Sequence, residues 1–473
     1  MREAPRQHSA TNLERLVAAH VAIFVIGVSW AFGGNADWVR TPISIWGSLG
    51  ALLTATLLLS RGARRRIAAG TIHWAWPVVM LNALVLASCL TPGFRVLGYG
   101  SDVYLMPLRV PWWIPSAARA ETALRALWLF DGIYFSCFNI ALAIAHRRLI
   151  RVLLAVAVGN ALVLSVFGTV QKLLGSGGIY FGAVKSPQDY FFASFVYDNH
   201  WGAFILLAMG ACLGLVLRYS NGTRGGGFFR GPSLAGLVAA FLIGLSVPFS
   251  GSRACTLLLA ILAAVALAKG APRVSRSLRA SGATPALAYA GLILAAVLAM
   301  WGAWTVAGDV IRSRASKAKE QVAAMWAERG IGARGILYGD TWRMARPRAA
   351  FGWGMGSYPS VFALYNTQVA KGDHIPVVYH DAHSDWLQSV AEIGFAGTAL
   401  IGAAVVLPAW AMRRLRVSPI PYFLLAGCIL VAAYAWVEFP FGNVAVVLSW
   451  WMSFFCAVQY VRLTGAPGTH PEA

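Results

Sequence analysis

Charged side chains are scarce in this sequence, and acidic ones are the scarcest. Only 12% of its 473 residues are Asp, Glu, Lys or Arg, whereas 58% are hydrophobic. Soluble globular proteins carry about 25% charged residues, so this chain lacks the side chains to cover an ordinary water-facing surface. The composition therefore excludes a soluble globular protein and predicts a chain that folds in a lipid bilayer.

Cysteine is sparse as well, and its placement argues against a disulfide framework. All six cysteines fall in or at the edge of apolar runs, and none forms a metal-ligand pair. A cleavable signal peptide is not expected either, because residues 1–15 are polar and the first apolar run leads into further spans.

The shortage of acidic residues leaves a net charge of +21. Such a charge can serve nucleic-acid binding, but the sequence contains no aromatic-basic module such as an RNA-recognition motif. The basic residues stand in short clusters between apolar runs, which is typical of membrane topology signals. We therefore expect membrane lipid, and no nucleic acid, among the partners.

Long apolar runs are abundant, and they are continuous rather than alternating as in transmembrane strands. A span needs about 20 apolar residues, so these runs predict about twelve transmembrane helices. The helices are expected at roughly residues 16–34, 42–60, 71–90, 127–145, 150–173, 201–218, 232–250, 254–269, 285–307, 387–411, 419–437 and 443–461. The predicted fold class is an all-α polytopic membrane protein.

Every second connection between these spans is basic. The clusters follow the second, fourth, sixth, eighth and tenth spans and comprise Arg61, Arg64, Arg65, Arg66, Arg147, Arg148, Arg151, Arg218, Arg224, Arg230, Lys269, Arg273, Arg276, Arg279, Arg413, Arg414 and Arg416. Basic connections stay in the cytoplasm. We therefore expect a bacterial inner-membrane protein with both termini in the cytoplasm and the other connections in the periplasm.

One outward connection is far longer than the others and divides the chain into three regions. Residues 1–307 hold spans one to nine, residues 308–386 form one large, partly helical periplasmic loop between spans nine and ten, and residues 387–473 hold the last three spans and a cytoplasmic tail. Within the loop, residues 310–328 are predicted to form an amphipathic helix on the membrane surface. Long loops of this kind concentrate function.

A tight outward turn places Arg253 between two spans, directly after Ser250-Gly251-Ser252. A guanidinium there suits a phosphate group, because it stays charged and forms two hydrogen bonds with phosphate oxygens. The alternative is an arginine that only anchors a helix end at the membrane interface.

The large loop holds a glycine string, Gly352-Trp353-Gly354-Met355-Gly356, which follows the segment from Arg334 to Arg343. Glycines allow the backbone to approach a ligand closely. No strand precedes the string, so it does not qualify as a nucleotide fingerprint, and a structural turn is the alternative. Arg343, Arg346 and Arg348 fit a solvated patch as well as a substrate site.

His383 stands just before the tenth span, with carboxylates close in sequence. The run is Tyr379-His380-Asp381-Ala382-His383-Ser384-Asp385, and Glu392 follows one to two turns into the helix. Histidine is the side chain best suited to move a proton near neutral pH. An interfacial histidine without chemistry is one alternative. A zinc site formed by the histidines and aspartates of this run is another, although their spacing matches no standard metal signature.

Taken together, these motifs resemble the O-antigen ligase and polymerase superfamily of bacterial inner-membrane proteins. The corresponding segments are Asn199-His200, Ser252-Arg253, Arg334 to Trp342, Phe351 to Tyr358, His383 to Leu387, and Glu392-Ile393-Gly394. The resemblance covers about residues 155–460. Ser384 and Ala333 depart from the Asn and Gly that the family's motifs carry at these two positions.

The resemblance implies a polyprenyl-diphosphate-linked glycan as donor, with lipid A-core or a further lipid-linked glycan as acceptor. The diphosphate is already a good leaving group, so no cofactor and no metal are expected. The catalytic candidates are His383 as general base for an inverting displacement, and Arg253 and Arg334 as phosphate-stabilising cations. Glu392 or Asp385 is expected to orient the histidine. The substrate-binding candidates are Arg343, Trp342, His200, Asn199, His380, Asp385 and Glu392.

Three other functions remain open. A polymerase of the same superfamily would extend a lipid-linked repeat unit, whereas we expect a ligase that transfers the finished glycan. A transporter or flippase would share the plan of about twelve spans. Few ionisable residues lie deep in the spans, however, and Asp131, the main exception, has no obvious partner. A membrane scaffold without catalysis is the third alternative.

Overall fold

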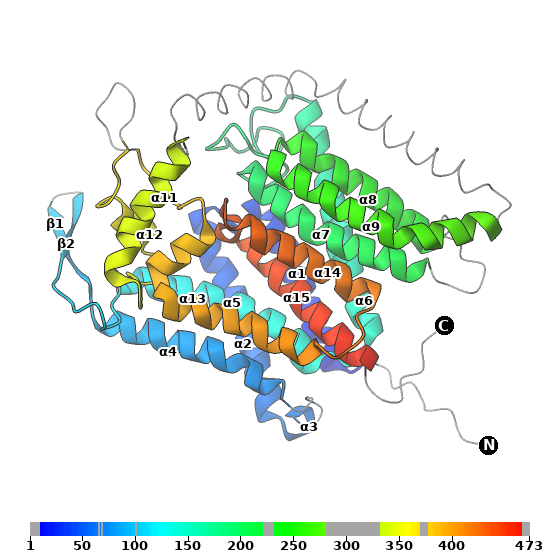
Figure 1. The fold of residues 1–473 in the computed structure, drawn as a ribbon, viewed down its shortest axis with the longest axis horizontal. Coiled ribbons are helices and arrows are strands. Elements are labelled where there is room, and N and C mark those ends of the chain that lie inside the picture. The colour runs from blue at the N-terminus through cyan, green and yellow to red at the C-terminus, as the bar shows by residue number, and fades with distance from the viewer. Residues whose placement is uncertain are drawn as a thin grey trace.

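The computed structural model describes residues 10–64, 67, 70–99, 102–220, 231–280, 332–368 and 377–465. In this part of the chain, ten helices are long and apolar enough to cross a membrane, and one shorter apolar helix accompanies them (Figure 1). The helices of the bundle are α1 (Asn12–Trp30), α2 (Asp37–Leu59), α4 (Trp76–Leu90, after the 3-10 turn η2, Ile72–Ala75), α5 (Ala120–Ala143), α6 (Arg147–Leu173), α7 (Asp198–Tyr219), α8 (Gly231–Ser250), α9 (Arg253–Ala280), α13 (Asp385–Met412), α14 (Pro419–Tyr434) and α15 (Val444–Gly465).

This architecture confirms the predicted all-α polytopic membrane fold. Each predicted span that falls on described residues corresponds to one of these helices. The ninth predicted span, 285–307, and the predicted surface helix, 310–328, lie outside the described residues. The fourth predicted span begins too late, because α5 already starts at Ala120. Glu121 and Arg125 form an exposed ion pair of 2.6 Å one turn apart there, which extends the helix through polar sequence.

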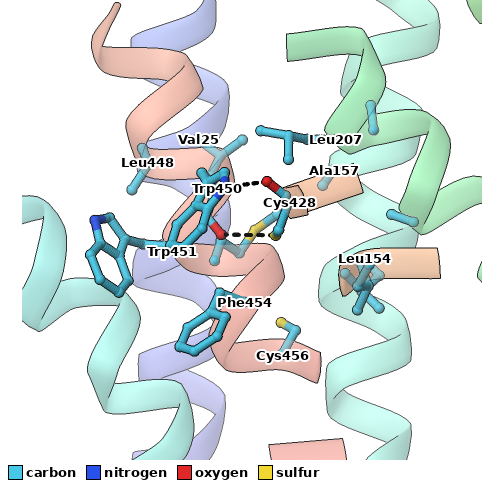
Figure 2. Packing of buried hydrophobic residues seen from close by; sticks show 14 of the residues in the cluster. Val25, Leu154, Ala157, Leu207, Cys428, Leu448, Trp450, Trp451, Phe454 and Cys456 are labelled. Carbon is cyan, nitrogen blue, oxygen red and sulfur yellow. Dashed lines mark hydrogen bonds between the residues drawn. The ribbon is translucent and has the colours of Figure 1, made fainter. Parts of the chain in front are cut away.

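α7 and α15 are the central helices, because nearly all their residues are buried. α7 approaches α14 closely through glycine. A Cβ atom added at Gly210 would lie 2.6 Å from the Phe423 carbonyl oxygen. Small residues at such contacts let helix backbones pack tightly where lipid removes the hydrophobic driving force. Reciprocal hydrogen bonds join α14 to α15, since Trp450 Nε1 donates to the Cys428 carbonyl at 2.9 Å and Cys428 Sγ donates to the Trp450 carbonyl (Figure 2).

Polar pairs connect the helices on the other side of the bundle. α2 and α5 run parallel and touch through Gly47 and Gly132, and Thr54 of α2 donates to Asn139 of α5 at 2.8 Å. Asp131 of α5 accepts a hydrogen bond of 2.9 Å from Asn82 of α4. The expectation that Asp131 lacks a partner was therefore wrong. Interhelical pairing satisfies this group locally, as polar groups in lipid require.

The described part of the large loop folds into a compact unit at one end of the bundle, termed here the loop unit. It comprises α11 (Gly332–Ala345), the 3-10 turn η3 (Arg346–Arg348), α12 (Tyr358–Phe362) and the segments around them. Its buried core includes Leu337, Met344, Trp353, Tyr358 and Phe362.

A small antiparallel hairpin, β1 (Phe94–Tyr99) and β2 (Asp102–Pro107), lies beside the loop unit (Figure 1). Its Phe94 ring packs 5.7 Å from that of Trp353. The sequence analysis predicted no strands in this connection. The two strands are six residues each, and a short isolated hairpin leaves little hydrophobic periodicity to detect.

The residues of the basic clusters that the structure describes lie at the helix ends away from the loop unit. Arg218 ends α7, Lys269 to Arg276 lie late in α9, and Arg413 to Arg416 follow α13, whereas the first residues of these three helices face the loop unit. At the same distant end, Glu14 of α1 and His146 before α6 form an ion pair of 2.6 Å. The arrangement separates a basic end of the bundle from the end that carries the loop unit.

Candidate functional site

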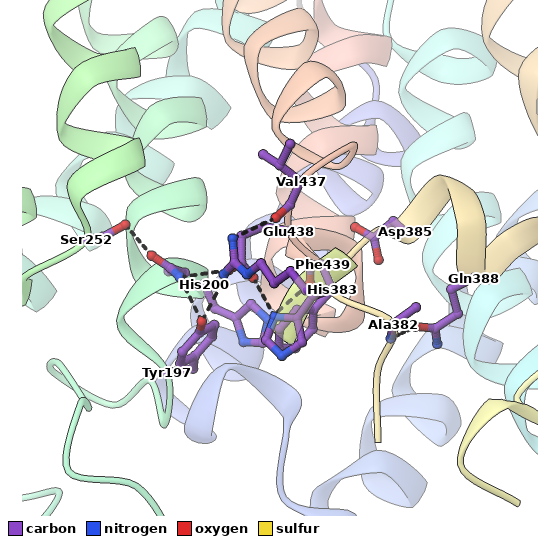
Figure 3. Close-up of polar contacts among 12 residues, drawn as sticks. Tyr197, His200, Ser252, Ala382, His383, Asp385, Gln388, Val437, Glu438 and Phe439 are labelled. Carbon is purple, nitrogen blue, oxygen red and sulfur yellow. Dashed lines mark hydrogen bonds and ion pairs between the residues drawn. The ribbon is translucent and has the colours of Figure 1, made fainter. Parts of the chain in front are cut away.

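Four segments meet at the loop-unit end of the bundle. They are the start of α7, the start of α9, the segment that leads into α13, and the link between α14 and α15 (Figure 3). α11 closes over them, because Arg334 donates to the Val437 carbonyl at 3.2 Å and Tyr338 donates to the His383 carbonyl at 2.9 Å. The site is thus assembled from four spans and the loop unit.

His383 adopts a backbone conformation that side chains other than glycine rarely take, with φ at 51°. The surrounding structure holds it there. Tyr338 donates to its carbonyl, the Ala382 amide donates to Gln388 Oε1 at 2.9 Å, and the Asp385 amide donates to the Ala435 carbonyl at 2.9 Å. The imidazole stands edge-on to Phe439 at 4.6 Å. Such strain costs about 1–3 kcal/mol and is found mainly where it positions a functional group.

Glu438, in the link between α14 and α15, is the carboxylate beside His383. Its Oε2 lies 3.3 Å from His383 Nδ1, and its Oε1 pairs with the Arg334 guanidinium. The Glu438 side chain is only 3% exposed, whereas that of Arg334 is 49% exposed. The expectation that Glu392 or Asp385 orients the histidine therefore does not match these contacts.

Glu438 stays ionised despite its burial. Burial alone would raise the pKa of this carboxyl, but the hydrogen bond with His383 and the positive charge of Arg334 outweigh it, and the pKa lies below its usual value. With Nδ1 facing this anion, the proton of neutral His383 is assigned to Nδ1. His383 Nε2 then carries the free lone pair, and it has no hydrogen-bond partner among the described residues.

Asn199 connects the glutamate to the start of α9. Its Nδ2 donates to Glu438 Oε1 at 3.3 Å and to Tyr197 at 2.8 Å, and its Oδ1 accepts from Ser252 Oγ at 2.5 Å. Burial and the nearby Glu438 charge raise the pKa of the Tyr197 phenol, which therefore stays protonated. Arg253 follows Ser252 directly, is exposed, and makes no hydrogen bond or ion pair within the described part of the chain. Its side chain is thus uncommitted, and its backbone directly follows a residue of the site.

His200 lies in the same cluster but both of its ring nitrogens are engaged. Nε2 faces the Phe439 carbonyl at 3.1 Å, which can only accept, so Nε2 carries the proton. Nδ1 then accepts from Asn35 Nδ2 at 3.3 Å, and Asn35 in turn binds Asn443. This histidine therefore ties the link between α14 and α15 to α7 and leaves no nitrogen for a substrate.

The glycine string forms a clasp on α13 and no phosphate cradle. Glu392 accepts hydrogen bonds from the amides of Gly356 at 2.7 Å and Tyr358 at 3.1 Å, and the Trp353 amide donates to the Ala391 carbonyl at 3.0 Å. A Cβ atom at Gly352 would lie 2.3 Å from the Glu392 backbone. The amides are therefore used to hold the loop unit on the helix, in agreement with the structural alternative for this motif.

The remaining candidates lie around the site in different roles. Asp385 accepts from the Phe441 amide at 2.8 Å and so fixes the link that carries Glu438. Arg343 pairs with Asp340, which also accepts two hydrogen bonds of 2.8 Å from Thr367. Trp342 and His380 are exposed. Within the described residues, no three His, Cys, Asp or Glu side chains converge into a set that could hold a metal ion.

Glu438 is the residue that the sequence analysis missed. One signal could have found it, because it is the only acidic residue between Glu392 and Glu472 and stands at the end of an apolar span that the sequence analysis predicts to face outward. A carboxylate isolated in sequence at such a position suggests a functional partner nearby.

Comparison with known proteins adds one match. The family model described as O-antigen ligase matches residues 238–402, a segment that contains Arg253, Arg334, the glycine string and His383. No curated protein matches the chain. The match supports a glycosyltransferase-type enzyme, and the family that it names implies lipid-linked glycan substrates in a membrane. The ten apolar helices agree with a multi-pass membrane protein. The match over residues 238–402 supports the O-antigen ligase and polymerase superfamily.

Proposed function

We propose that this protein transfers a glycan from polyprenyl diphosphate to an acceptor hydroxyl, with lipid A-core as acceptor, at the periplasmic face of the bacterial inner membrane. The observation that carries the proposal is the arrangement of His383, which is 27% exposed and faces the Glu438 carboxylate through Nδ1, while Arg334 pairs with the same carboxylate. A base with one nitrogen held and one free is what a hydroxyl acceptor requires.

The proposed reaction is a single displacement. The acceptor oxygen attacks the anomeric carbon from the side opposite the diphosphate, and its proton passes to His383 Nε2. The bond between the anomeric carbon and the diphosphate oxygen breaks, and its electron pair leaves with polyprenyl diphosphate. The glycan is thereby joined with inverted configuration. Glu438 stabilises the imidazolium that forms, as a buried anion hydrogen-bonded to Nδ1 can.

Arg253 and Arg334 are proposed to bind the two phosphates. Arg334 uses part of its guanidinium on Glu438 and the Val437 carbonyl, and its 49% exposure leaves other N–H groups available. Arg253 is exposed and has no partner in the described structure. Cations fixed where negative charge develops on the leaving group lower the barrier more than mobile ones would.

The other candidates are proposed to fall into two groups, one that holds the segments of the site in place and one that contacts the glycan. Asn199, His200, Asp385 and Glu392 position the segments of the site through the hydrogen bonds described above. Trp342, Arg343 and His380 are exposed on the loop unit or next to it and are proposed to contact sugar residues of the glycan. We also propose that residues 308–386 form the periplasmic loop and that residues 1–307 and 387–473 hold the membrane spans.

In vitro transfer with a defined donor tests the proposal. Purified protein would receive a polyprenyl-diphosphate-linked glycan and either lipid A-core or a second lipid-linked glycan. We expect product with lipid A-core, a loss of about 10²–10⁴-fold for His383→Ala, and comparable losses for Arg253→Ala and Arg334→Ala. Arg276→Ala, at the opposite end of α9, is the matched control and should keep wild-type activity.

Other outcomes would redirect the assignment. Full activity of His383→Ala would remove the proposed base. Product formed only with the second lipid-linked glycan would identify a polymerase. Movement of the donor across vesicle membranes without any product would identify a flippase. We further expect transfer to survive a chelator, and loss that zinc restores would instead implicate His380 and His383 as ligands.

A further inference from the structure

A groove of about 320 Å³ lies between α1 and α2, far from the site described above. Its walls are almost entirely apolar and comprise Leu16, Ala19, His20, Ile23, Trp46, Leu49, Leu52, Leu53 and Thr56. Both helices are membrane spans, so the groove opens to the hydrocarbon region of the bilayer.

Two stacked rings form the inner wall of the groove, and the groove runs along both helices. The His20 ring stacks on Trp46 with centroids 5.6 Å apart and planes at 6°, and its Nε2 is held by Ser136 Oγ of α5 at 2.9 Å. From this wall the groove runs along α1 to Leu16 and along α2 to Thr56, which lie near the basic end of the bundle. Seven residues of α1 separate Leu16 from Ile23, or about 10 Å at 1.5 Å per residue. This length fits within one leaflet of hydrocarbon, about 15 Å thick.

Two arginines flank the groove residues of α1 and α2 in the sequence, at the basic end of the bundle. Arg15 precedes Leu16 and, four residues before Ala19, lies on the same helical stripe as the groove. Arg64 ends the short helix α3 (Arg61–Arg64), which follows α2. Both side chains are exposed, and neither has a hydrogen bond or ion pair with any residue that the structure describes. Exposed arginines at the end of an apolar groove are complementary to a phosphate that carries an acyl chain.

We propose that this groove binds one acyl chain of an anionic phospholipid, with Arg15 and Arg64 at its phosphate. The lipid fills the space between α1 and α2 beside the His20–Trp46 stack, and both helices also contact Ser136 of α5 there. A bound chain stabilises the folded bundle, because the site exists only where α1 and α2 are packed on α5. The site is separate from the glycan-transfer site in both position and chemistry.

Thermal unfolding of the full-length protein in detergent tests the lipid site. We expect added phosphatidylglycerol to raise the Tm in a saturable manner and phosphatidylcholine with the same chains to raise it less. Ala19→Phe places an aromatic ring in the groove at an exposed position and should raise the apparent Kd at least about tenfold, because each methylene excluded from the groove loses binding free energy. Val163→Phe, on the 56% exposed surface of α6, is the matched control and should bind as the wild type does.

The headgroup is tested separately. Arg15→Gln combined with Arg64→Gln should reduce the effect of phosphatidylglycerol to that of phosphatidylcholine, whereas Arg148→Gln, an exposed arginine at the same end of the bundle, should change nothing. Inorganic phosphate alone should leave the Tm unchanged. Equal responses of wild type and Ala19→Phe, or a full response to inorganic phosphate, would overturn the proposal. Failure of glycan transfer would leave these results unaffected.

Discussion

At the scale of single residues, the carboxylate that contacts His383 belongs to Glu438, which is distant in sequence. Asp385 and Glu392 were the natural candidates, because they stand within one helix of the histidine. The structure uses both to fix backbone, at Phe441 and at the glycine string, and brings Glu438 to Nδ1 at 3.3 Å. The histidine and the two arginines are candidates that their motifs suggest, and they stay predictions. Their partner could not be predicted, because it depends on how α14 packs against α7 and α13.

Glu438→Gln tests this pairing through kinetics. We expect kcat to fall about tenfold to a hundredfold, less than the about 10²–10⁴-fold that a general base supplies, because the imidazolium loses its anionic neighbour. The KM for the donor should not rise, since Arg334 is released from the carboxylate and remains free for phosphate. A general loss of structure would instead reduce the amount of folded protein. Glu121→Gln, an exposed glutamate on α5, is the control.

The pH dependence of stability provides a second check on Glu438. Its folded-state pKa is lowered, so its contribution to stability is complete above the usual value of 4.5 and is lost as the pH falls through the folded value. We expect the Tm of the wild type in detergent to fall below about pH 4.5. The Tm of Glu438→Gln should fall less over the same range, because amides do not titrate. Parallel curves for the two proteins would show that Glu438 is not held as an anion.

At the scale of elements, the glycine string and α13 form one clasp. Gly394 interrupts α13 with φ 67° and ψ −179°, a conformation open essentially to glycine alone. There the Phe395 and Ala396 amides donate to the Ala349 and Ala350 carbonyls, at 2.8 and 3.1 Å. The motif predicted a tight backbone correctly. Its partner, a kink inside a span that reads as continuous helix, could not be predicted from hydropathy.

Gly394→Ala should break this clasp. The added Cβ would lie 2.3 Å from the Ala350 carbonyl oxygen, and the backbone conformation itself is strained for alanine. We expect a loss of at least about 2 kcal/mol in the free energy of unfolding and reduced transfer, because the loop unit carries Arg334. Gly402→Ala in the same helix meets no atom within 4 Å and should be neutral or stabilising by up to about 1 kcal/mol. Thermal unfolding of both variants in detergent measures the difference.

At the scale of the whole molecule, hydropathy predicted the bundle because each span carries its own signal in about 20 consecutive residues. The contacts between spans carry no such signal. Asp131 accepts a hydrogen bond from Asn82 of another helix. The β-hairpin contacts the loop unit through Phe94, which packs against Trp353. The positions of the basic clusters could be predicted in part. The basic clusters predict a side of the membrane, and the structure places them at the bundle end opposite His383, yet membrane sidedness itself is tested only in cells.

Cysteine labelling in spheroplasts tests this orientation. Gln188, between α6 and α7, and Arg414, between α13 and α14, are both exposed but lie at connections predicted to face opposite sides. We expect a membrane-impermeant maleimide to label Gln188→Cys in intact spheroplasts and Arg414→Cys only after permeabilisation, because basic connections are retained in the cytoplasm. The background is low, since five native cysteines are buried and Cys89 is partly so. The reverse pattern would place His383 in the cytoplasm, where nucleotide sugars are present, and would remove the reason for a lipid-linked donor.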